Sequence, residues 1–317
     1  CDDMLGWVEK TVGFIEDDGF DIGDRVDMLL SSDTPEGVAK SMGLGTVGFA
    51  QAYARSRPDI LLALGDRFEM HAAVVAALPF KIPVAHIHGG EITEGAMDDA
   101  LRHSITKLSH VHFVATAEYR DRVLQMGEEP WRVVVTGAPS LDNIRSMDLF
   151  QPSELAAECG LSLEPPPLLV TFHPVTLEDE NTAWQVGELL AAVDACGMPV
   201  IITQSNADMK GRMITRMMRD YAEGPARAQM VENLGAKGYF SVMAGAAAMV
   251  GNSSSGIIEA ASFGLPVVNI GKRQQGRVRA KNVIDVDDNR EAILSGIRRA
   301  ANPGFRASLT AMSNPYG

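Results

Sequence analysis

The stretch GNSSSGIIEA, residues 251–260, decides the fold, because it joins an apolar run to a helical pattern through two glycines and three consecutive serines. The apolar residues AAAMV at 246–250 predict a strand that ends at this turn. A helix start carries unpaired backbone N–H groups, serine hydroxyls add donors, and glycine lets a ligand approach the backbone. We therefore predict a phosphate-type anion site formed by Ser253, Ser254, Ser255 and Gly256.

A basic stretch, GKRQQGRVRAK at 271–281, follows this turn. It contains five basic residues and no acidic one, although the formal net charge of the chain is −13. A phosphorylated ligand would explain both stretches. Each stretch alone is also compatible with a simpler interpretation, a serine helix cap and a solvated basic loop. The prediction therefore rests on their combination.

Length and composition predict a soluble globular protein. Of the 317 residues 46% are apolar, enough for two domains with separate cores, and no segment is long and apolar enough to span a membrane. The net charge of −13 argues against general binding to nucleic acid or anionic membranes. The three cysteines are too few and too scattered for a disulfide framework or a zinc site. We expect a cytoplasmic protein with no nucleic-acid or membrane partner.

Short aliphatic runs alternate with amphipathic helical stretches, which indicates an α/β fold with doubly wound parallel sheets. Because the runs do not alternate apolar with polar residues, we expect strands buried on both faces. Prolines and broken periodicity at 148–166 indicate a boundary between Rossmann-like domains at 1–147 and 148–317. The expected strands are 60–64, 84–87, 111–115, 133–135, 168–172, 200–203, 248–250 and 266–270.

Polar residues follow nearly every predicted strand. Ligands of open α/β sheets bind beyond the carboxyl ends of the strands, so these residues are candidates for a site. In the first domain they are Asp66 and Arg67 in GDRFE, and His88, Glu91 and Asp98 in HIHGGEITEGAMDD. In the second domain they include His173 in FHPVT, Asn206 in TQSNAD, the serines of GNSSSG, and Arg273 in GKRQQGR. If two such sheets face each other, acids lie opposite phosphate-binding groups.

The carboxylates of the first domain suit proton transfer, although any one of them could be an ordinary turn or cap residue. Crowded carboxylates repel, so one can hold a proton while another accepts one. Asp98 begins a predicted helix, whose dipole favours the ionised form expected of a base. The histidines of HIHGGE are suitable metal ligands, but neither HExxH nor paired-cysteine spacing accompanies them, so we expect no metal site.

The chain resembles a known family through six motifs in this order: GDRFE, HIHGGEITEGAMDD, RHSITKLSHVHFVAT, FHPVT, GNSSSGIIEA and GKRQQGR. Over almost its whole length it is similar to the hydrolysing UDP-N-acetylglucosamine 2-epimerases. The resemblance implies the two-domain GT-B fold, with the nucleotide sugar in the cleft between Rossmann-like domains. It also implies elimination of UDP to a 2-acetamidoglucal, followed by addition of water that gives free UDP and a manno-configured sugar, without a cofactor.

The resemblance also implies roles for single residues. It makes Asp66 and Asp98 members of the proton-handling set and brings His173 near the diphosphate. It assigns the contacts with the nucleotide to Ser253 and Ser254 on the diphosphate, to Glu259 on the ribose hydroxyls, and to Arg67, Asn206 and Arg273 around UDP.

Two features depart from the family pattern. Some members have HIEGGE where this chain has HIHGGE, so His88 occupies the position of a catalytic carboxylate. Either His88 acts itself or Glu91 takes over part of the proton transfer. In addition, the chain begins at Cys1 on a helical pattern, and we expect that the family's first strand and its glycine–arginine loop precede it.

Several alternatives stay open. The substrate is either UDP-N-acetylglucosamine or a UDP-2,4-diacetamido-trideoxyhexose, the legionaminic acid precursor. The motifs are also compatible with a non-hydrolysing epimerase, a GT-B glycosyltransferase, or a nucleotide-sugar sensor without turnover. The acidic residues count against the transferase. The resemblance implies a homodimer or a homotetramer.

Overall fold

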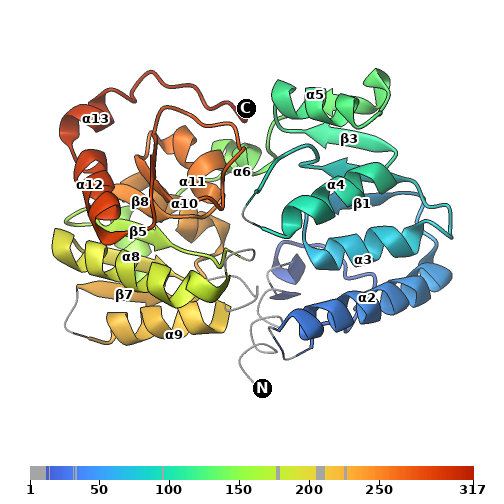
Figure 1. The fold of residues 1–317 in the computed structure, drawn as a ribbon, viewed down its shortest axis with the longest axis horizontal. Helices are drawn as coiled ribbons and strands as arrows, with labels where there is room; N and C mark the ends of the chain where they lie inside the picture. Colours follow the sequence, from blue (N-terminus) through green and yellow to red (C-terminus); the bar gives the residue numbers. More distant parts are fainter. Residues whose placement is uncertain are drawn as a thin grey trace. The chain divides into compact units, whose positions relative to one another are not determined.

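The computed structural model describes residues 12–13, 15–30, 32, 34–94, 96–175, 179–204, 211–224 and 227–317. They form two β-sheets, each with parallel strands and accompanying helices (Figure 1). The chain divides into two compact units. Unit 1 comprises Cys1–Gly90, Ala100–Phe113 and Arg122–Val134, and unit 2 comprises Glu91–Asp99, Val114–Asp121 and Val135–Gly317. The chain therefore enters unit 2 twice for short segments before it stays there.

Unit 1 is built mainly on a four-stranded sheet in the order β1-β2-β3-β4. Strand β1 pairs in parallel with β2, and β2 pairs in parallel with β3. Helices connect these strands, as parallel pairing requires. The strands are β1 (Leu61–Leu64), β2 (Val84–Ile87), β3 (Val111–Val114) and β4 (Val133–Val135). The helices are α2 (Pro35–Ser56), α3 (Phe68–Ala77), α4 (Asp98–Leu108), α5 (Ala117–Gln125) and the 3-10 helix η1 (Pro130–Arg132).

The core of unit 1 lies between the sheet and helices α2, α3 and α4. Ala63 of β1 and Val84 of β2 share one buried cluster with Tyr53, Val74 and Ile105 of these helices. Apolar burial of this kind is the main stabilising contribution to a sheet–helix layer. The core thus fixes the strand ends from which the polar residues of unit 1 emerge.

Unit 2 contains a six-stranded sheet in the order β10-β9-β8-β5-β6-β7, in which every neighbouring pair is parallel. The strands are β5 (Leu168–Thr171), β6 (Val200–Thr203), β7 (Ala228–Val231), β8 (Ala248–Gly251), β9 (Val267–Ile270) and β10 (Val283–Val286). The α-helices are α6 (Ser140–Ser146), α7 (Pro152–Cys159), α8 (Thr182–Cys196), α9 (Gly211–Ala222), α10 (Gly235–Gly245), α11 (Ser255–Ile258), α12 (Arg290–Ala300) and α13 (Pro303–Ala307). Two 3-10 helices are η2 (Asp179–Asn181) and η3 (Ala260–Phe263).

Helices cover both faces of the six-stranded sheet. Leu168 and Val170 of β5 share a buried cluster with residues of α8, α9 and α12. Leu169, which points to the opposite face, belongs to a second cluster with residues of α7 and α10. Strands that are buried on both faces read as continuous apolar runs, which explains the sequence LLVT of β5.

The strand order of unit 2 fixes where a ligand can bind. Counted from β5, the order corresponds to the 3-2-1-4-5-6 arrangement of the Rossmann fold. The order reverses between β5 and β8, so the connections that follow these two strands diverge to opposite faces of the sheet. A crevice forms outside the carboxyl ends of the strands at such a point. FHPVT and GNSSSG follow β5 and β8, respectively.

Capping residues determine where several helices begin. Thr34 precedes α2 and its side chain accepts a hydrogen bond from the backbone N–H of Gly37 at 3.1 Å, with Pro35 in the first turn. Asn289 caps α12 in the same way, accepting from the N–H of Ala292 at 3.0 Å. These caps satisfy N–H groups that have no partner inside the helix.

The predicted α/β fold with parallel sheets is confirmed, and each of the eight predicted strands agrees with an observed strand to within one residue. Strands β7 and β10 were missed because they lie at the two edges of the sheet and are only partly buried. The expectation that every strand is buried on both faces is wrong for β1, where Leu62 and Leu64 are 59% and 53% exposed. It is also wrong for β4, which like β1 is an edge strand of its sheet and exposes Val134 and Val135.

The change from one sheet to the other falls between the end of β4 and the start of β5, a range that includes residues 147 and 148. The domain boundary at this position stays a prediction. Among the described residues, no helix combines the length and the hydropathy that a bilayer crossing requires.

Gly251→Ala is expected to destabilise unit 2. Gly251 ends β8 with a φ of 142°, and a Cβ there would lie 1.9 Å from the backbone oxygen of Thr171. Because this oxygen belongs to the central strand β5, it cannot move aside, and we expect the free energy of unfolding to fall by about 3 kcal/mol. Chemical denaturation followed by circular dichroism measures the change.

Gly187→Ala is the matched control for this prediction. Gly187 lies in α8, and a Cβ there would have no atom within 4 Å. Alanine in a helix interior is favoured over glycine, so this variant should be unchanged or more stable by about 0.5–1 kcal/mol. Equal stability of the two variants would contradict the proposed clash at Gly251.

Candidate functional site

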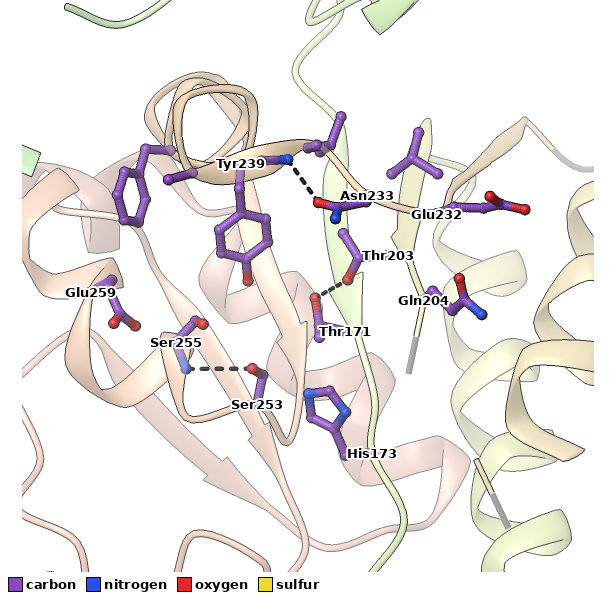
Figure 2. Close-up of a pocket in the computed structure, with 15 residues that line it drawn as sticks. Thr171, His173, Thr203, Gln204, Glu232, Asn233, Tyr239, Ser253, Ser255 and Glu259 are labelled. Carbon is purple, nitrogen blue, oxygen red and sulfur yellow. Dashed lines mark hydrogen bonds between the residues drawn. The ribbon is translucent and has the colours of Figure 1, made fainter. Parts of the chain in front are cut away.

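A pocket of about 380 Å³ lies in unit 2 at the switch point between β5 and β8 (Figure 2). The residues that line it come from the ends of several strands and from the helices that follow them. Its polar members include Thr171, His173, Thr203, Ser253, Ser255 and Glu259. The sequence had indicated four of these: His173, Ser253, Ser255 and Glu259.

The GNSSSG turn supplies hydroxyl and N–H donors to this pocket. Ser253 and Ser255 line it, while Ser254 is the cap residue of the four-residue helix α11. The N–H of Ser255 donates to the hydroxyl of Ser253 at 3.4 Å. Gly256 has a packing role, because a Cβ there would lie 2.9 Å from Cγ1 of Val267 in β9. The glycine lets the helix start lie close against the sheet.

Asn252 joins the exits of β5 and β8. Its Oδ1 accepts the N–H of His173 at 2.7 Å, and its Nδ2 donates to the carbonyl of His173 at 2.8 Å. Its own carbonyl accepts from Nη1 of Arg273 at 3.0 Å and from Nε2 of Gln274 at 2.8 Å. Asn252 is fully buried, so these bonds fix His173 and the basic loop relative to the serine turn. This role was not predicted from the sequence, although Asn252 lies within GNSSSG.

Glu259 lies four residues after Ser255 and reaches the same pocket (Figure 2). Its Oε1 accepts a hydrogen bond of 2.7 Å from the hydroxyl of Ser140, at the start of α6. A carboxylate that is oriented by a hydroxyl can accept hydrogen bonds from a ligand in a defined direction. Ser140 was not among the predicted site residues, because 119 positions separate it from Glu259 in sequence.

Tyr239 of α10 forms a further wall of the pocket, and Figure 2 shows its ring directed toward Ser255 and Thr171. Burial raises the pKa of the Tyr239 hydroxyl to about 12, so it stays a neutral donor at ordinary pH. Thr171 and Thr203 share a hydrogen bond of 2.6 Å at the ends of β5 and β6. Tyr239 follows strand β7, so failure to predict that strand also concealed this residue.

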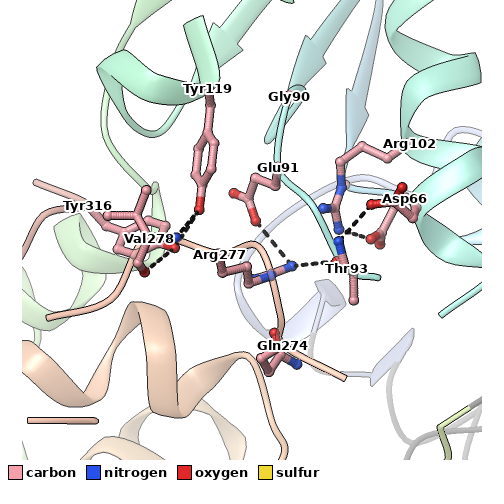
Figure 3. A network of polar contacts seen from close by, with 12 residues as sticks. Asp66, Gly90, Glu91, Thr93, Arg102, Tyr119, Gln274, Arg277, Val278 and Tyr316 are labelled. Carbon is pink, nitrogen blue, oxygen red and sulfur yellow. Dashed lines mark hydrogen bonds and ion pairs between the residues drawn. The ribbon is translucent and has the colours of Figure 1, made fainter. Parts of the chain in front are cut away.

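Glu91 is buried in unit 2 and forms an ion pair with Arg277, with Oε2 and Nη2 3.1 Å apart (Figure 3). Burial acts to lower the pKa of Arg277, but the combined effect of Glu91, Tyr316, Tyr119 and Glu259 outweighs it, so the pKa lies above its ordinary value. Asp98, the first residue of α4, is half-buried and follows in the same short segment of unit 2. The next residue, Asp99, accepts the N–H of Thr93 at 2.7 Å.

Unit 1 contributes Asp66 and Arg67 directly after β1. Asp66 is ion-paired with Arg102 of α4, and the two side chains are 19% and 2% exposed, respectively (Figure 3). The guanidinium is thus removed from solvent while the carboxylate keeps an accessible side. Arg67 donates to Glu69 at 3.3 Å and is partly exposed. The ion pair with Arg102 thus holds the Asp66 carboxylate in a defined orientation.

The two histidines of HIHGGE have different surroundings in unit 1. His86 is fully buried, and its ring lies 2.8 Å from the carbonyl of Gly65 and 3.1 Å from the hydroxyl of Thr106. It therefore fixes the backbone immediately before Asp66. His88 is half-buried and adopts a φ of 64°, an uncommon left-handed conformation for a residue other than glycine. Such strain is often found at functional sites.

The predicted site residues are divided between the two units. Unit 2 holds the pocket residues, Glu91 and Asp98, whereas unit 1 holds Asp66, Arg67 and His88. That the two groups act on one bound molecule stays a prediction, and Asn206 lies outside the described residues. In the part of the chain that the structure describes, no three His, Cys, Asp or Glu side chains are grouped so as to hold a metal ion.

The sequence matches the family UDP-N-acetylglucosamine 2-epimerase over residues 7–317. GDP/UDP-N,N'-diacetylbacillosamine 2-epimerase (hydrolyzing) of Campylobacter jejuni is 39% identical over 272 residues, which cover 85% of this chain and 71% of that protein. UDP-N,N'-diacetylbacillosamine 2-epimerase (hydrolyzing) of Legionella pneumophila is 38% identical over 293 residues, 92% of this chain and 77% of that protein.

Solved structures support the fold. The crystal structure of Methanocaldococcus jannaschii UDP-GlcNAc 2-epimerase in complex with UDP-GlcNAc and UDP matches with a TM-score of 0.78 at 18% identity, covering 96% of this chain and 83% of that chain. At this identity the match shows the fold alone, which is the GT-B type with two parallel-sheet α/β domains. The family match and the two relatives above show that the chain belongs to the hydrolysing UDP-N-acetylglucosamine 2-epimerase family.

Proposed function

We propose that this enzyme converts a UDP-2-acetamido sugar into free UDP and the corresponding manno-configured sugar. The observation that carries the proposal is the pocket in unit 2, where serine donors and the oriented carboxylate of Glu259 line one cavity. Its volume of about 380 Å³ lies within the range of roughly 300–1,000 Å³ that is usual for small-molecule sites. Hydrolysis of the nucleotide bond is supported by the names of the relatives at 38–39% identity.

The proposed nucleotide contacts follow from the chemistry of the pocket. The hydroxyls of Ser253 and Ser255 are donors for the diphosphate, and His173 and Arg273 lie next to the same turn through Asn252. Cationic and hydroxyl donors stabilise the charge that develops on a departing diphosphate. The carboxylate of Glu259 is proposed to accept hydrogen bonds from the two ribose hydroxyls.

The proposed reaction has two steps. In the first, a base removes the proton from sugar carbon 2 while the bond from carbon 1 to the diphosphate oxygen breaks, which leaves a 2-acetamidoglucal and UDP. In the second, water adds its hydroxyl to carbon 1, and a proton returns to carbon 2 on the opposite face. General acids and bases of suitable geometry are needed for both steps. We propose Asp66, Asp98 and His88 for these proton transfers, without a cofactor.

UDP-N,N'-diacetylbacillosamine is the proposed substrate, because the relatives from Campylobacter and Legionella carry this sugar in their names. UDP-N-acetylglucosamine is the second candidate, since it is the sugar in the family's name. The products belong to sialic or legionaminic acid biosynthesis. We further propose a cytoplasmic homodimer or homotetramer, a state that light scattering coupled to gel filtration measures directly.

Incubation with each of the two UDP-sugars tests the reaction. Proton NMR should show equal amounts of free UDP and of a manno-configured sugar from at least one substrate. When the reaction is run in D2O, deuterium should be incorporated at carbon 2 of that sugar. Retention of UDP on the epimerised sugar would identify a non-hydrolysing epimerase instead, and dependence on an acceptor sugar would identify a glycosyltransferase. Absence of turnover for both substrates would contradict the proposal.

Asp66→Asn should separate catalysis from binding. If Asp66 transfers a proton, kcat should fall by about 10²–10⁴-fold, while UDP affinity measured by calorimetry stays within about twofold. Asp142→Asn, at a position on α6 that is 81% exposed, is the control and should leave both quantities unchanged. If the protein were a nucleotide-sugar sensor, both variants would keep the UDP affinity of the wild type, and neither the wild type nor the variants would show turnover.

Ser140→Ala tests the proposed ribose contact. Hydrogen bonds to a charged group contribute about 1.5–3 kcal/mol, so the wild type should prefer UDP over 2′-deoxy-UDP by about tenfold or more. Without the Ser140 hydroxyl, Glu259 loses a hydrogen bond that orients it, and this preference should fall severalfold, as measured by calorimetry with both nucleotides. Ser146→Ala, on the same helix, is the matched control, because that exposed hydroxyl donates to the carbonyl of Asp142 within its own helix. An unchanged preference in Ser140→Ala would exclude the assigned role.

A further inference from the structure

We propose that Glu91 and Arg277 are positioning residues that anchor the segment of residues 91–99, which carries Asp98, to the part of unit 2 that holds the nucleotide pocket. The inference rests on the proposed function for the meaning of that pocket. It assigns to Glu91 a structural role in place of proton transfer. It also gives a role to Arg277, which the sequence places in the basic loop without a specific contact.

The burial of the pair supports positioning over chemistry. Glu91 is 1% exposed and Arg277 is 9% exposed, so neither presents an accessible charge to a substrate. Glu91 Oε2 lies 3.1 Å from Arg277 Nη2, which also donates to the hydroxyl of Thr93 at 3.4 Å. One guanidinium therefore holds two residues at the start of the segment.

Two tyrosines lie near the Glu91–Arg277 pair (Figure 3). The hydroxyls of Tyr119 and Tyr316 lie 2.7 Å apart, and both bond to the backbone of Val278, which follows Arg277. Both rings are fully buried. In such a low-dielectric environment an ion pair is stronger than in water, and loss of either partner leaves an uncompensated charge.

Packing around Gly276 brings the basic loop into direct contact with the segment. Gly276 has a φ of 84°, and a Cβ there would lie 2.4 Å from Cγ2 of Ile92. Any larger residue would need both an unfavourable backbone conformation and displacement of Ile92. The loop and the start of the segment therefore form one packed body inside unit 2.

The same loop is tied to the serine turn at its other end. Gln274 and Arg273 both donate to the carbonyl of Asn252, at 2.8 and 3.0 Å. Arg279 reinforces the loop by donating to the carbonyls of Arg277 and Gln274, at 2.8 and 3.1 Å. A continuous set of contacts thus links Glu91 with the turn that bears Ser253 and Ser255.

The segment transmits this anchoring to Asp98 through its own hydrogen bonds. The N–H of Thr93 donates to the side chain of Asp99 at 2.7 Å, and the N–H of Ala96 donates to the carbonyl of Thr93 at 3.0 Å. The N–H of Asp99 donates to the carbonyl of Ala96 at 3.2 Å. Because Thr93 is held by Arg277, these bonds tie Asp99, the neighbour of Asp98, to the basic loop within unit 2. A shift of about 1 Å in a reacting group can cost about 10²-fold in rate, so such fixation matters for catalysis.

Arg277→Met and Glu91→Gln test the anchor. Each variant should lower kcat by about 10–100-fold while UDP affinity stays within about twofold, because the pocket itself is not altered. The double variant Glu91→Leu with Arg277→Met removes both charges and should lose no more than either single variant. Arg298→Met, at an exposed position of α12, is the matched control and should behave as the wild type.

Hydrogen–deuterium exchange provides a readout that does not depend on the reaction. In Arg277→Met, amide exchange should rise in residues 91–99 and stay unchanged in α2, whereas Arg298→Met should change neither. Unchanged exchange in residues 91–99, or equal losses in kcat and UDP affinity, would overturn the anchor. Failure of the wild type to bind UDP would instead contradict the proposed function and leave the exchange test of the anchor intact.

Discussion

The side-chain amide of Asn252 makes two hydrogen bonds with the backbone of His173, while the backbone carbonyl of Asn252 accepts from Arg273 and Gln274. This set of contacts exists because β5 and β8 are parallel neighbours at the switch point of the sheet, so that their exits diverge from one place. Full burial of Asn252 makes these bonds hard to replace by water. The three segments FHPVT, GNSSSG and GKRQQGRVRAK are therefore held in one arrangement, on which the pocket depends.

Charged residues in this protein divide by exposure into two classes of role. Glu259 lines the pocket and Asp66 keeps an accessible side, so both are available to a ligand. Glu91 and Arg277 are buried with each other and orient the backbone instead. A buried ion pair contributes little net stability, but it penalises alternative arrangements that separate the charges. The same residue type is thus accessible at one position and buried in an ion pair at another.

The sequence predicted the eight more apolar strands to within one residue, because burial produces continuous aliphatic runs. Strands β7 and β10 escaped this criterion because edge strands are only partly buried. The missed strand β7 concealed Tyr239 as well. His173, Ser253 and Ser255 of the pocket were predicted from their positions after strands, and Glu259 from the family resemblance. Ser140 could not be predicted, since hydrogen bonds between distant segments leave no local pattern in the sequence.

By itself the sequence determined the α/β class and the family, because these depend on residue type and on local order along the chain. Only the tertiary structure decided which charges are buried and which partner each one has. Glu91 and Asp98 are equivalent acids in the motif, yet one is paired with an arginine 186 positions away and the other begins a helix. Pairing and burial depend on how distant segments pack, and packing is a property of the folded chain.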